Sequence, residues 1–272
     1  MTYSVALEAQ TLIISPTGLL TWTENETQYV VVSTEFLSEL WAPLGQPITR
    51  APGQSSMAIQ WGKPTQFFRL KPGGQFRDEF DGSHEPWRVT FFAPAESSQH
   101  TLTYTNGALR IQGAANVNDG RFYLQPPAFA RTNVADFHIS VDVIDWPDTG
   151  TEQIIGILAR SNGSNAYIAE LWRYCRIAAR KTVLNIWDGA LGHWTAVDVN
   201  ADKHYRLVFT GVTNRLVCSL YDLSDLQTPV SSVRITNNTF GAGTVGLWCS
   251  REYGPGLYDA TIDNFAVTGT KP

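Results

Sequence analysis

The sequence has few cysteines, and their spacing excludes some common uses of the thiol. Only Cys175, Cys218 and Cys249 occur among 272 residues, and no CxxC pair is present. This odd number disfavours a zinc site or a disulfide framework, although the sequence does not exclude one disulfide between two of the three cysteines. Cys218 and Cys249 lie in apolar strand patterns, which predicts two small buried side chains.

Basic tracts and long apolar runs are also missing. The net charge is −5 and no basic cluster stands out along most of the chain, so we expect no nucleic-acid partner. No apolar run reaches about 18 residues, so no membrane span is predicted. The first residues lack the basic region and apolar core of an export signal. The protein is therefore either cytoplasmic or has lost such a signal.

The usual signatures of several enzyme classes are absent. The five histidines show no HxH or HExxH spacing, so a zinc centre is not expected. No GxSxG elbow and no glycine-rich phosphate loop occurs, although the sequence alone does not exclude a Ser-His-Asp triad. Glycosidases usually need two facing carboxyl groups, and the Glu-x-Asp-x-x-Glu spacing, whose first two carboxylates would share one face of a strand, is not found. Asp142 and Asp145 are three apart, so a regular strand would point them to opposite faces.

Short alternating patterns dominate what is present. Apolar residues alternate with polar ones in residues 137–143, 205–209, 216–220 and 245–249, as is typical of half-buried antiparallel strands. Residues 168–181 could be taken for a helix, but the NGSN turn signal before them favours a hairpin. The sequence therefore predicts an all-β protein. Nine Trp, ten Tyr and thirteen Phe suit its strands and cores.

The sequence KPGGQ at residues 71–75 predicts a boundary, because proline and two glycines should break a strand and form a flexible joint. We expect a small β-sandwich module over residues 1–72 and a larger domain over residues 76–270. Strand candidates of the first module are residues 12–14, 19–23, 29–33, 56–60 and 66–70. Its LTW, YVVVSTEFL, WAPL and FFRL segments resemble a fibronectin type III or immunoglobulin-like accessory module. That resemblance implies export and a spacer role.

The larger domain resembles the concanavalin A-like lectin/glucanase family, which includes laminin-G-like and 3-keto-disaccharide hydrolase domains. The resemblance is carried by DEFD at 78–81, Trp87, GALRI at 107–111, FHISVDV at 137–143, GILAR at 156–160, GTVGL at 243–247 and DNFAV at 263–267. It implies a jelly-roll β-sandwich of about 190 residues. The resemblance says little about activity, because the same fold occurs in lectins, hydrolases, lyases and inert spacers.

Glu170 is the acidic residue of most interest. On a strand it shares one face with Ile168 and Trp172, an arrangement that suits a sugar because carboxylates bind hydroxyls and indoles stack on rings. The alternative is a solvated glutamate paired with Arg160, Arg173 or Arg176.

Other candidates for a ligand-binding surface are tryptophans and arginines. We rank Trp187 and Trp194 above Trp172 and Trp248, because the first two are expected on loops, where recognition residues concentrate; core packing is the alternative for all four. Arg160, Arg173, Arg176, Arg180 and Lys181 could bind an acidic polysaccharide, or could guard an edge strand.

No cofactor is predicted, apart from a structural calcium ion. Asp78, Asp81 and Asp263 could supply its oxygen ligands, because the first and last strands of this fold usually pair. Turn formation is the alternative role for these aspartates.

From these features we expect a secreted or cell-surface bacterial protein that binds a polysaccharide or other glycan without cutting it. Its surface would use Arg160, Glu170, Trp172, Arg173, Trp187, Trp194 and Trp248. The first alternative is a glycoside hydrolase or polysaccharide lyase of plant or algal polysaccharide, with Glu170 as acid or base. The second is a structural or adhesion segment.

Overall fold

The computed structural model describes 18 segments of the chain. These are residues 3–7, 10–15, 17–23, 28–34, 42–51, 54–59, 67–82, 87–91, 100–113, 121–126, 133–147, 149–150, 152–172, 176–183, 186–190, 195–200, 202–252 and 256–272. The regular elements in these segments are all β-strands, which confirms the predicted all-β class. No helix within them is long and apolar enough to cross a membrane.

The first part of the chain forms a five-stranded sheet and part of a second sheet. The five-stranded sheet has the order β1 (Tyr3–Leu7), β2 (Gln10–Ile14), β3 (Leu19–Thr23), β7 (Gln54–Ala58) and β6 (Ile48–Ala51). β4 (Tyr29–Thr34) and β5 (Ala42–Pro43) pair with each other outside this sheet. A separate buried cluster fills this part, formed by Leu20, Trp22, Val31, Met57, Ile59 and Phe68. The small β-sandwich is as predicted; its fibronectin-like identity stays a prediction.

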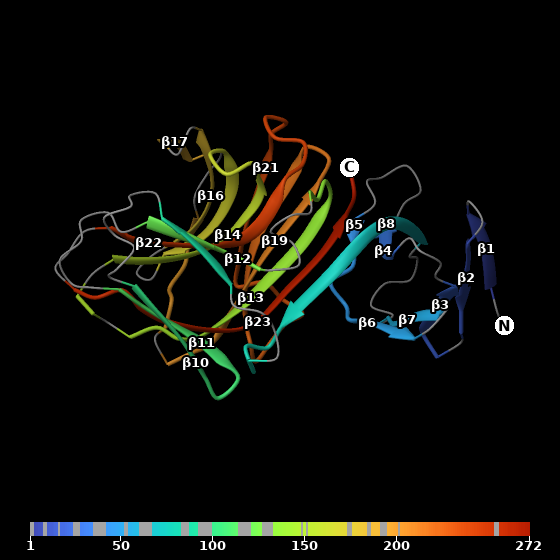
Figure 1. The fold of residues 1–272 in the computed structure, drawn as a ribbon, viewed down its shortest axis with the longest axis horizontal. Coiled ribbons are helices and arrows are strands. Elements are labelled where there is room, and N and C mark those ends of the chain that lie inside the picture. The colour runs from blue at the N-terminus through green and yellow to red at the C-terminus, as the bar shows by residue number, and fades with distance from the viewer. Residues whose placement is uncertain are drawn as a thin grey trace.

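The predicted flexible joint at residues 71–75 is wrong, because one strand runs straight through it. β8 (Phe67–Asp78) pairs with β4 through residues 67–72 and with β23 (Asp259–Thr270) through residues 73–78. Figure 1 shows β8 passing from the small group of strands near the N terminus into the large body. A Cβ at Gly73 would lie 2.3 Å from the carbonyl oxygen of Gly269. Glycine is therefore needed there for the close approach of two strands.

Side-chain contacts add to this shared strand. Gln75 donates from Nε2 to the carbonyl oxygen of Gln46 at 2.7 Å and accepts from the backbone N–H of Ile48 at 2.8 Å. Lys71 forms an ion pair with Asp136 at 3.2 Å. The two parts are therefore joined by a continuous strand and by polar contacts on both sides of it.

The larger part is a sandwich of two sheets. The ten-stranded sheet has the order β21 (Ser231–Thr236), β20 (Arg215–Asp222), β19 (Tyr205–Val212), β13 (Phe137–Asp145), β23, β8, β4 and β5. β11 (Ala108–Gly113) also pairs with β23, and β10 (His100–Thr105) pairs with β11.

The second sheet has eight strands. Its order is β17 (Ile186–Ala190), β16 (Arg176–Val183), β15 (Ala166–Trp172), β14 (Glu152–Ser161), β22 (Thr244–Glu252), β12 (Arg121–Gln125) and β9 (Arg88–Phe91), with β18 (Thr195–Ala196) on β16. β15 and β16 are antiparallel neighbours, which confirms the hairpin predicted for residues 168–181.

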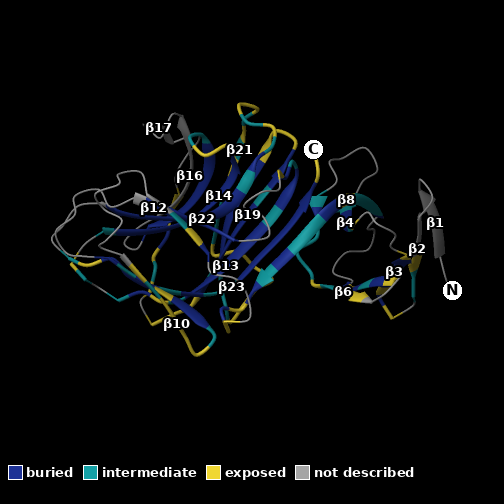
Figure 2. Cartoon of the chain, in the orientation of Figure 1, coloured by how far each residue is buried: buried dark blue, intermediate teal, exposed yellow. Residues whose placement is uncertain are grey.

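The core lies between these two sheets, and the alternating patterns face it as predicted. Ile139, Val141, Leu207 and Phe209 of one sheet and Leu247 of the other belong to a single buried cluster. Cys218 and Cys249 are also buried in it with free thiols, as predicted, while Cys175 lies outside the described residues. Figure 2 shows the buried residues concentrated along the central strands of both sheets.

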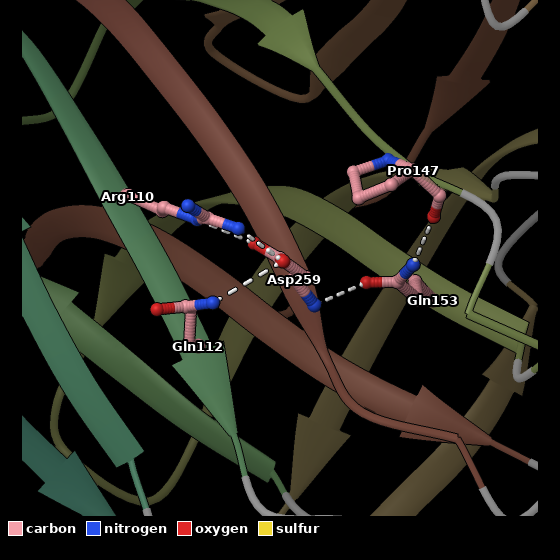
Figure 3. Close-up of polar contacts among 5 residues, drawn as sticks. All are labelled: Arg110, Gln112, Pro147, Gln153 and Asp259. Atoms are coloured by element: carbon pink, nitrogen blue, oxygen red, sulfur yellow. Dashed lines mark hydrogen bonds and ion pairs between the residues drawn. The ribbon is translucent and has the colours of Figure 1, made fainter.

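A polar clamp joins the two sheets near the first residues of β14 and β23 (Figure 3). Gln153, which is fully buried, accepts from the backbone N–H of Asp259 at 2.6 Å and donates to the carbonyl oxygen of Pro147 at 2.9 Å. Arg110 binds the Asp259 carboxylate with two hydrogen bonds of 2.9 and 2.7 Å, and Gln112 donates to it at 3.2 Å. The clamp thus satisfies buried polar groups where β14 meets β23.

Candidate functional site

A second buried cluster lies on the eight-stranded sheet, and it is separate from the core between the sheets. We call it the outer cluster; its members are Tyr123, Ile154, Leu158, Ala166, Ile168, Trp172 and Trp248. They alternate along β12, β14, β15 and β22 with the residues that face the core between the sheets, such as Leu171 and Leu247. Period-two geometry therefore assigns them to the opposite face of this sheet.

Glu170 lies on that same face, between Ile168 and Trp172 along β15. Its side chain is 0% exposed, and its Oε2 accepts a hydrogen bond of 3.0 Å from the indole Nε1 of Trp172. The shared face predicted for Ile168, Glu170 and Trp172 is confirmed. The solvation expected in the alternative is wrong, because this carboxylate has no exposure to water. Its pairing with Arg173 or Arg176 stays a prediction, because the side chains of both arginines lie outside the description.

The strand register brings the second tryptophan near this carboxylate. Gly156 of β14 is the register partner of both Glu170 and Trp248, so it stands between them across the sheet. A Cβ at Gly156 would lie 2.7 Å from the carbonyl oxygen of Ala169 and 3.2 Å from the Cβ of Trp248. The row from Trp248 to Glu170 therefore has no intervening side chain.

A buried hydroxyl belongs to the same face. Ser250 follows Trp248 by two residues on β22, and it is opposite Ile154 in the register. Its side chain is 0% exposed, and its Oγ has no hydrogen-bond partner in the structure as described. Buried hydroxyls are normally paired, so this one is available to a polar ligand group.

The predicted stacking residues are only partly described. Trp172 and Trp248 are 1% and 0% exposed, so they do not offer an open stacking surface in this structure. Trp187 belongs to β17, but its side chain lies outside the description. Arg173 and Trp194 lie outside the described residues altogether.

Arg160 lies away from the outer cluster. It is 2% exposed and donates to the carbonyl oxygens of Ala135 at 2.9 Å and Phe240 at 3.0 Å. Its guanidinium also lies over the rings of Phe137 and Tyr167, 5.5 and 6.0 Å from their centroids. Burial lowers its pKa from the ordinary arginine value. These contacts link the two sheets, so the side chain of Arg160 lies toward the core between the sheets and not on the face that carries Glu170.

The aspartates considered for calcium have other partners. The Asp78 carboxylate accepts from the backbone N–H of Phe80 and from the indole of Trp87, both at 2.7 Å. Asp263 accepts from Asn264, and Asp81 is exposed. The first and last strands of the large domain do pair, as expected. The described residues contain no group of three or more His, Cys, Asp or Glu side chains that could hold a metal ion, and the calcium site stays a prediction.

The outer cluster offers a single described carboxylate rather than a facing pair. Glu152 is on the same strand face as Gly156 but four residues away, which corresponds to about 13 Å along β14. Paired carboxylates of glycosidases are about 5 to 9.5 Å apart. The arrangement can bind hydroxyls and sugar rings, and the described residues give no second carboxylate for acid–base work on a glycosidic bond.

Comparisons with known proteins find similar folds without close relatives. No family model and no curated protein matches the sequence. A carbohydrate-binding module, CBM66 from Bacillus subtilis, is 16% identical, with a TM-score of 0.44 over 69% of this chain and 94% of that one. Arcelin-5, a lectin-like defense protein from Phaseolus vulgaris, is 11% identical, with a TM-score of 0.49 over 74% and 99% of the two chains.

A family GH16 non-specific endo-β-1,3(4)-glucanase is 10% identical, with a TM-score of 0.49 over 74% of this chain and 96% of that one. All three TM-scores lie below 0.5. The architecture, a β-sandwich of two sheets, follows from the strand order and register of the structure itself.

Sequence reasoning missed Tyr123, Ile154, Gly156 and Ser250 as members of this site. Each lies two residues from another member or directly opposite one on a neighbouring strand. Alternation places side chains on a face, but only the pairing of β12, β14 and β22, which are far apart in sequence, brings them beside Glu170.

Proposed function

We propose that this protein binds carbohydrate through the outer face of its eight-stranded sheet. The observation that carries the proposal is the fully buried Glu170, bonded to Trp172 and close in the register to Trp248. A carboxylate accepts strong hydrogen bonds from sugar hydroxyls, and indoles pack against the apolar faces of sugar rings. The partner would be a polysaccharide or other glycan, met by a secreted or cell-surface bacterial protein.

The burial of Glu170 favours a functional role over a purely structural one. Removing a carboxylate from water is costly, and a stable fold does not need one in an aromatic cluster outside its main core. Titratable groups in such costly positions concentrate at functional sites. The hydroxyl of Ser250 on the same face provides a further polar group that a ligand could satisfy.

The same burial sets an expectation for the affinity. A ligand that contacts Glu170 and Trp172 must replace the contacts that now shield them. If only a minor fraction of the protein molecules has Glu170 and Trp172 open to a ligand, the apparent affinity is reduced in proportion to that fraction. We therefore expect weak binding to single sugars and measurable binding to long polymers that make many contacts.

Affinity gel electrophoresis with laminarin, xyloglucan and alginate tests the proposal. The wild-type protein should be retarded by at least one of these polymers. Glu170→Gln keeps the volume and an acceptor for Trp172 but loses the charge, and we expect its dissociation constant to rise about tenfold. Glu79→Gln, at an exposed position after β8, is the matched control and should bind like the wild type. Equal retardation of all three proteins would contradict a role for Glu170.

The enzyme alternative is tested with the same polymers. A hydrolase would release new reducing ends and a lyase would form unsaturated products, and Glu170→Gln would abolish both. Binding without either product supports the lectin-like function.

A further inference from the structure

The hairpin of β10 and β11 leaves one edge of a sheet without a neighbouring strand. β10 pairs with β11, which pairs with β23, and within the described residues no strand follows β10 on its other side. Figure 1 shows this hairpin at the lower margin of the large body. The outer edge of β10 therefore presents backbone N–H and C=O groups with which another strand could pair.

β10 lacks the residues that usually prevent such pairing. The outer strands of four or more residues in the two large sheets are β9, β10, β17 and β21. β9 contains Arg88, β17 contains Asp188 and β21 contains Arg234. β10, with the sequence HTLTYT, contains no lysine, arginine, acidic residue or proline. Charges and prolines on an edge strand normally block the addition of a further strand, so β10 is the most open of these four edges.

The turn of the hairpin determines which backbone groups point outward. Residues 106–107 both have positive φ, 53° and 74°, and Thr105 lies opposite Ala108, which defines a two-residue type I′ turn. The two residues that flank such a turn are hydrogen-bonded to each other, and bonded and non-bonded pairs alternate along an antiparallel pair of strands. The N–H and C=O groups of Leu102 and Tyr104 therefore point away from β11.

The side chains of β10 form two uncharged faces. Leu102 packs against the core between the sheets, and Tyr104 lies on the same face of the strand but is 38% exposed. The hydroxyl of Tyr104 accepts a hydrogen bond of 3.5 Å from the backbone N–H of Trp87, which holds the ring in place. The opposite face is exposed and consists of Thr101, Thr103 and Thr105. An added strand would therefore meet apolar side chains on one face and hydroxyls on the other.

The sequence of β10 is complementary to itself in an antiparallel pair. If Thr103 lies opposite Thr103 of a second copy, Leu102 lies opposite Tyr104, and the outward backbone groups of the two strands face each other. The same register places Thr101 opposite Thr105. Pairs of aromatic and aliphatic residues and pairs of threonines stabilise neighbouring strands, and no like charges oppose each other here. A second copy therefore fits both the hydrogen-bonding pattern and the side chains of this edge.

We propose that the protein forms a two-fold symmetric dimer through antiparallel pairing of β10 with β10 of a second copy. Both copies use the same surface, and the pairing continues the sheet of β11 and β23 into the second molecule. A contact of one strand from each copy buries less than about 1,200 Å², so we expect a weak dimer that forms as the concentration rises. The inference does not depend on the function proposed for the outer face, because β10 contributes no residue to the outer cluster.

Sedimentation velocity of the full-length protein over a range of concentrations tests the dimer. The wild type should shift from monomer to dimer as the concentration increases. Thr103→Lys places two like charges opposite each other at the two-fold axis and should weaken association by about tenfold. Thr236→Lys, at an exposed position of the edge strand β21, adds the same charge and should associate like the wild type. A wild type that stays monomeric at every concentration, or a Thr103→Lys variant that dimerises equally well, would overturn the inference.

Cysteine cross-linking tests the register of the two strands. In a Cys175→Ser background the two remaining cysteines are buried. Thr103→Cys should then give a disulfide-linked dimer when oxidised by copper phenanthroline in air, because residue 103 meets its own copy in a non-hydrogen-bonded pair, with Cα atoms about 4.5 Å apart. Thr101→Cys is the matched control on the same face of the strand. It meets residue 105 of the second copy and should cross-link much more slowly; equal rates for the two variants would contradict the pairing.

Discussion

Replacing Arg160 by methionine should destabilise the protein without changing carbohydrate binding. The guanidinium donates to two backbone carbonyls, those of Ala135 and Phe240, and the side chain is 2% exposed. Methionine fills much of the volume but leaves both carbonyls without this donor. A hydrogen bond from a charged donor contributes about 1.5 to 3 kcal/mol, and the removal of a buried charge from the fold offsets part of that loss. We therefore expect the free energy of unfolding to fall by about 3 kcal/mol.

The assay is thermal unfolding at neutral pH, followed by circular dichroism. A loss of this size should lower Tm by about 6 to 12 °C in a domain of roughly this length. Arg110→Met is the matched control. Arg110 is paired with Asp259 at 2.7 Å, but its side chain is 47% exposed, and exposed ion pairs contribute about 1 kcal/mol or less. Its Tm should fall by no more than about 4 °C.

The reasoning is refuted if Arg160→Met unfolds within about 2 °C of the wild type. It is also refuted if that variant loses retardation by polysaccharide while Arg110→Met retains it. Either result would mean that Arg160 acts toward a ligand, as the sequence alone predicted, rather than as a link between the sheets. The Tm of Arg160→Lys should lie between those of Arg160→Met and the wild type. The lysine ammonium keeps the positive charge but cannot form the two forked hydrogen bonds of a guanidinium.

Three further outcomes are expected. Gly243→Ala should be strongly destabilising in thermal melts, because its Cβ would lie 2.4 to 2.6 Å from the backbone of residues 160–161, whereas Gly241→Ala, with open space around its Cβ, should melt like the wild type. Burial raises the pKa of Asp263, and the negative charges of Asp142 and Glu79 add to this rise. The folded state therefore holds that proton more tightly, so the carboxyl stabilises the fold below its unfolded pKa of about 3.9, and this stabilisation is lost as the pH rises through the folded pKa. Asp263→Asn should accordingly raise Tm at pH 7 but not near pH 3; an equal gain at both pH values would contradict this. Burial raises the pKa of Cys249 to about 12 and that of Cys218 still further, so in a variant without the third cysteine neither thiol should react with Ellman's reagent at pH 8 until the protein unfolds.

Much of the strand content could be predicted because alternation is a local property. Residues 137–143 and 205–209 repeat with period two, and β13 and β19 lie where this pattern predicts them. The joint at Pro72, Gly73 and Gly74 could not be predicted in the same way. Proline and glycine usually end strands, but here Pro72 is the last residue paired with β4 and Gly73 the first paired with β23. Gly73 is needed because β8 approaches β23 closely at Gly269, which is nearly 200 residues away in the sequence.

The candidate site was predicted along one strand and missed across strands. The face shared by Ile168, Glu170 and Trp172 followed from alternation within β15. Trp248 was among the tryptophans predicted for the ligand surface, but its position beside Glu170, and the addition of Ser250, depend on the pairing of β14 with β22, whose register partners are about 90 residues apart in the chain. Burial was not predictable either, because a pattern of alternating residues assigns a side chain to a face without saying whether that face meets water.

Arg160 shows where local rules fail and why. Counting by twos along β14 would place Arg160 on the face of Leu158, with the outer cluster. The register of β14 against β22 shifts between Leu158 and Ser161, and Arg160 itself has a positive φ of 51°. A residue in this left-handed conformation breaks the alternation, so the side chain turns toward Phe137 and Tyr167, between the sheets. Five non-glycine residues with positive φ are described in this protein, and two of them, Arg160 and Asn264, lie within strands. Both carry polar side chains with hydrogen bonds to distant parts of the chain. Arg160 donates to the carbonyls of Ala135 and Phe240, which lie outside the strands, and Asn264 donates to Asp142 of β13. At these two strained positions polar contacts, rather than apolar alternation, decide which way the side chain points.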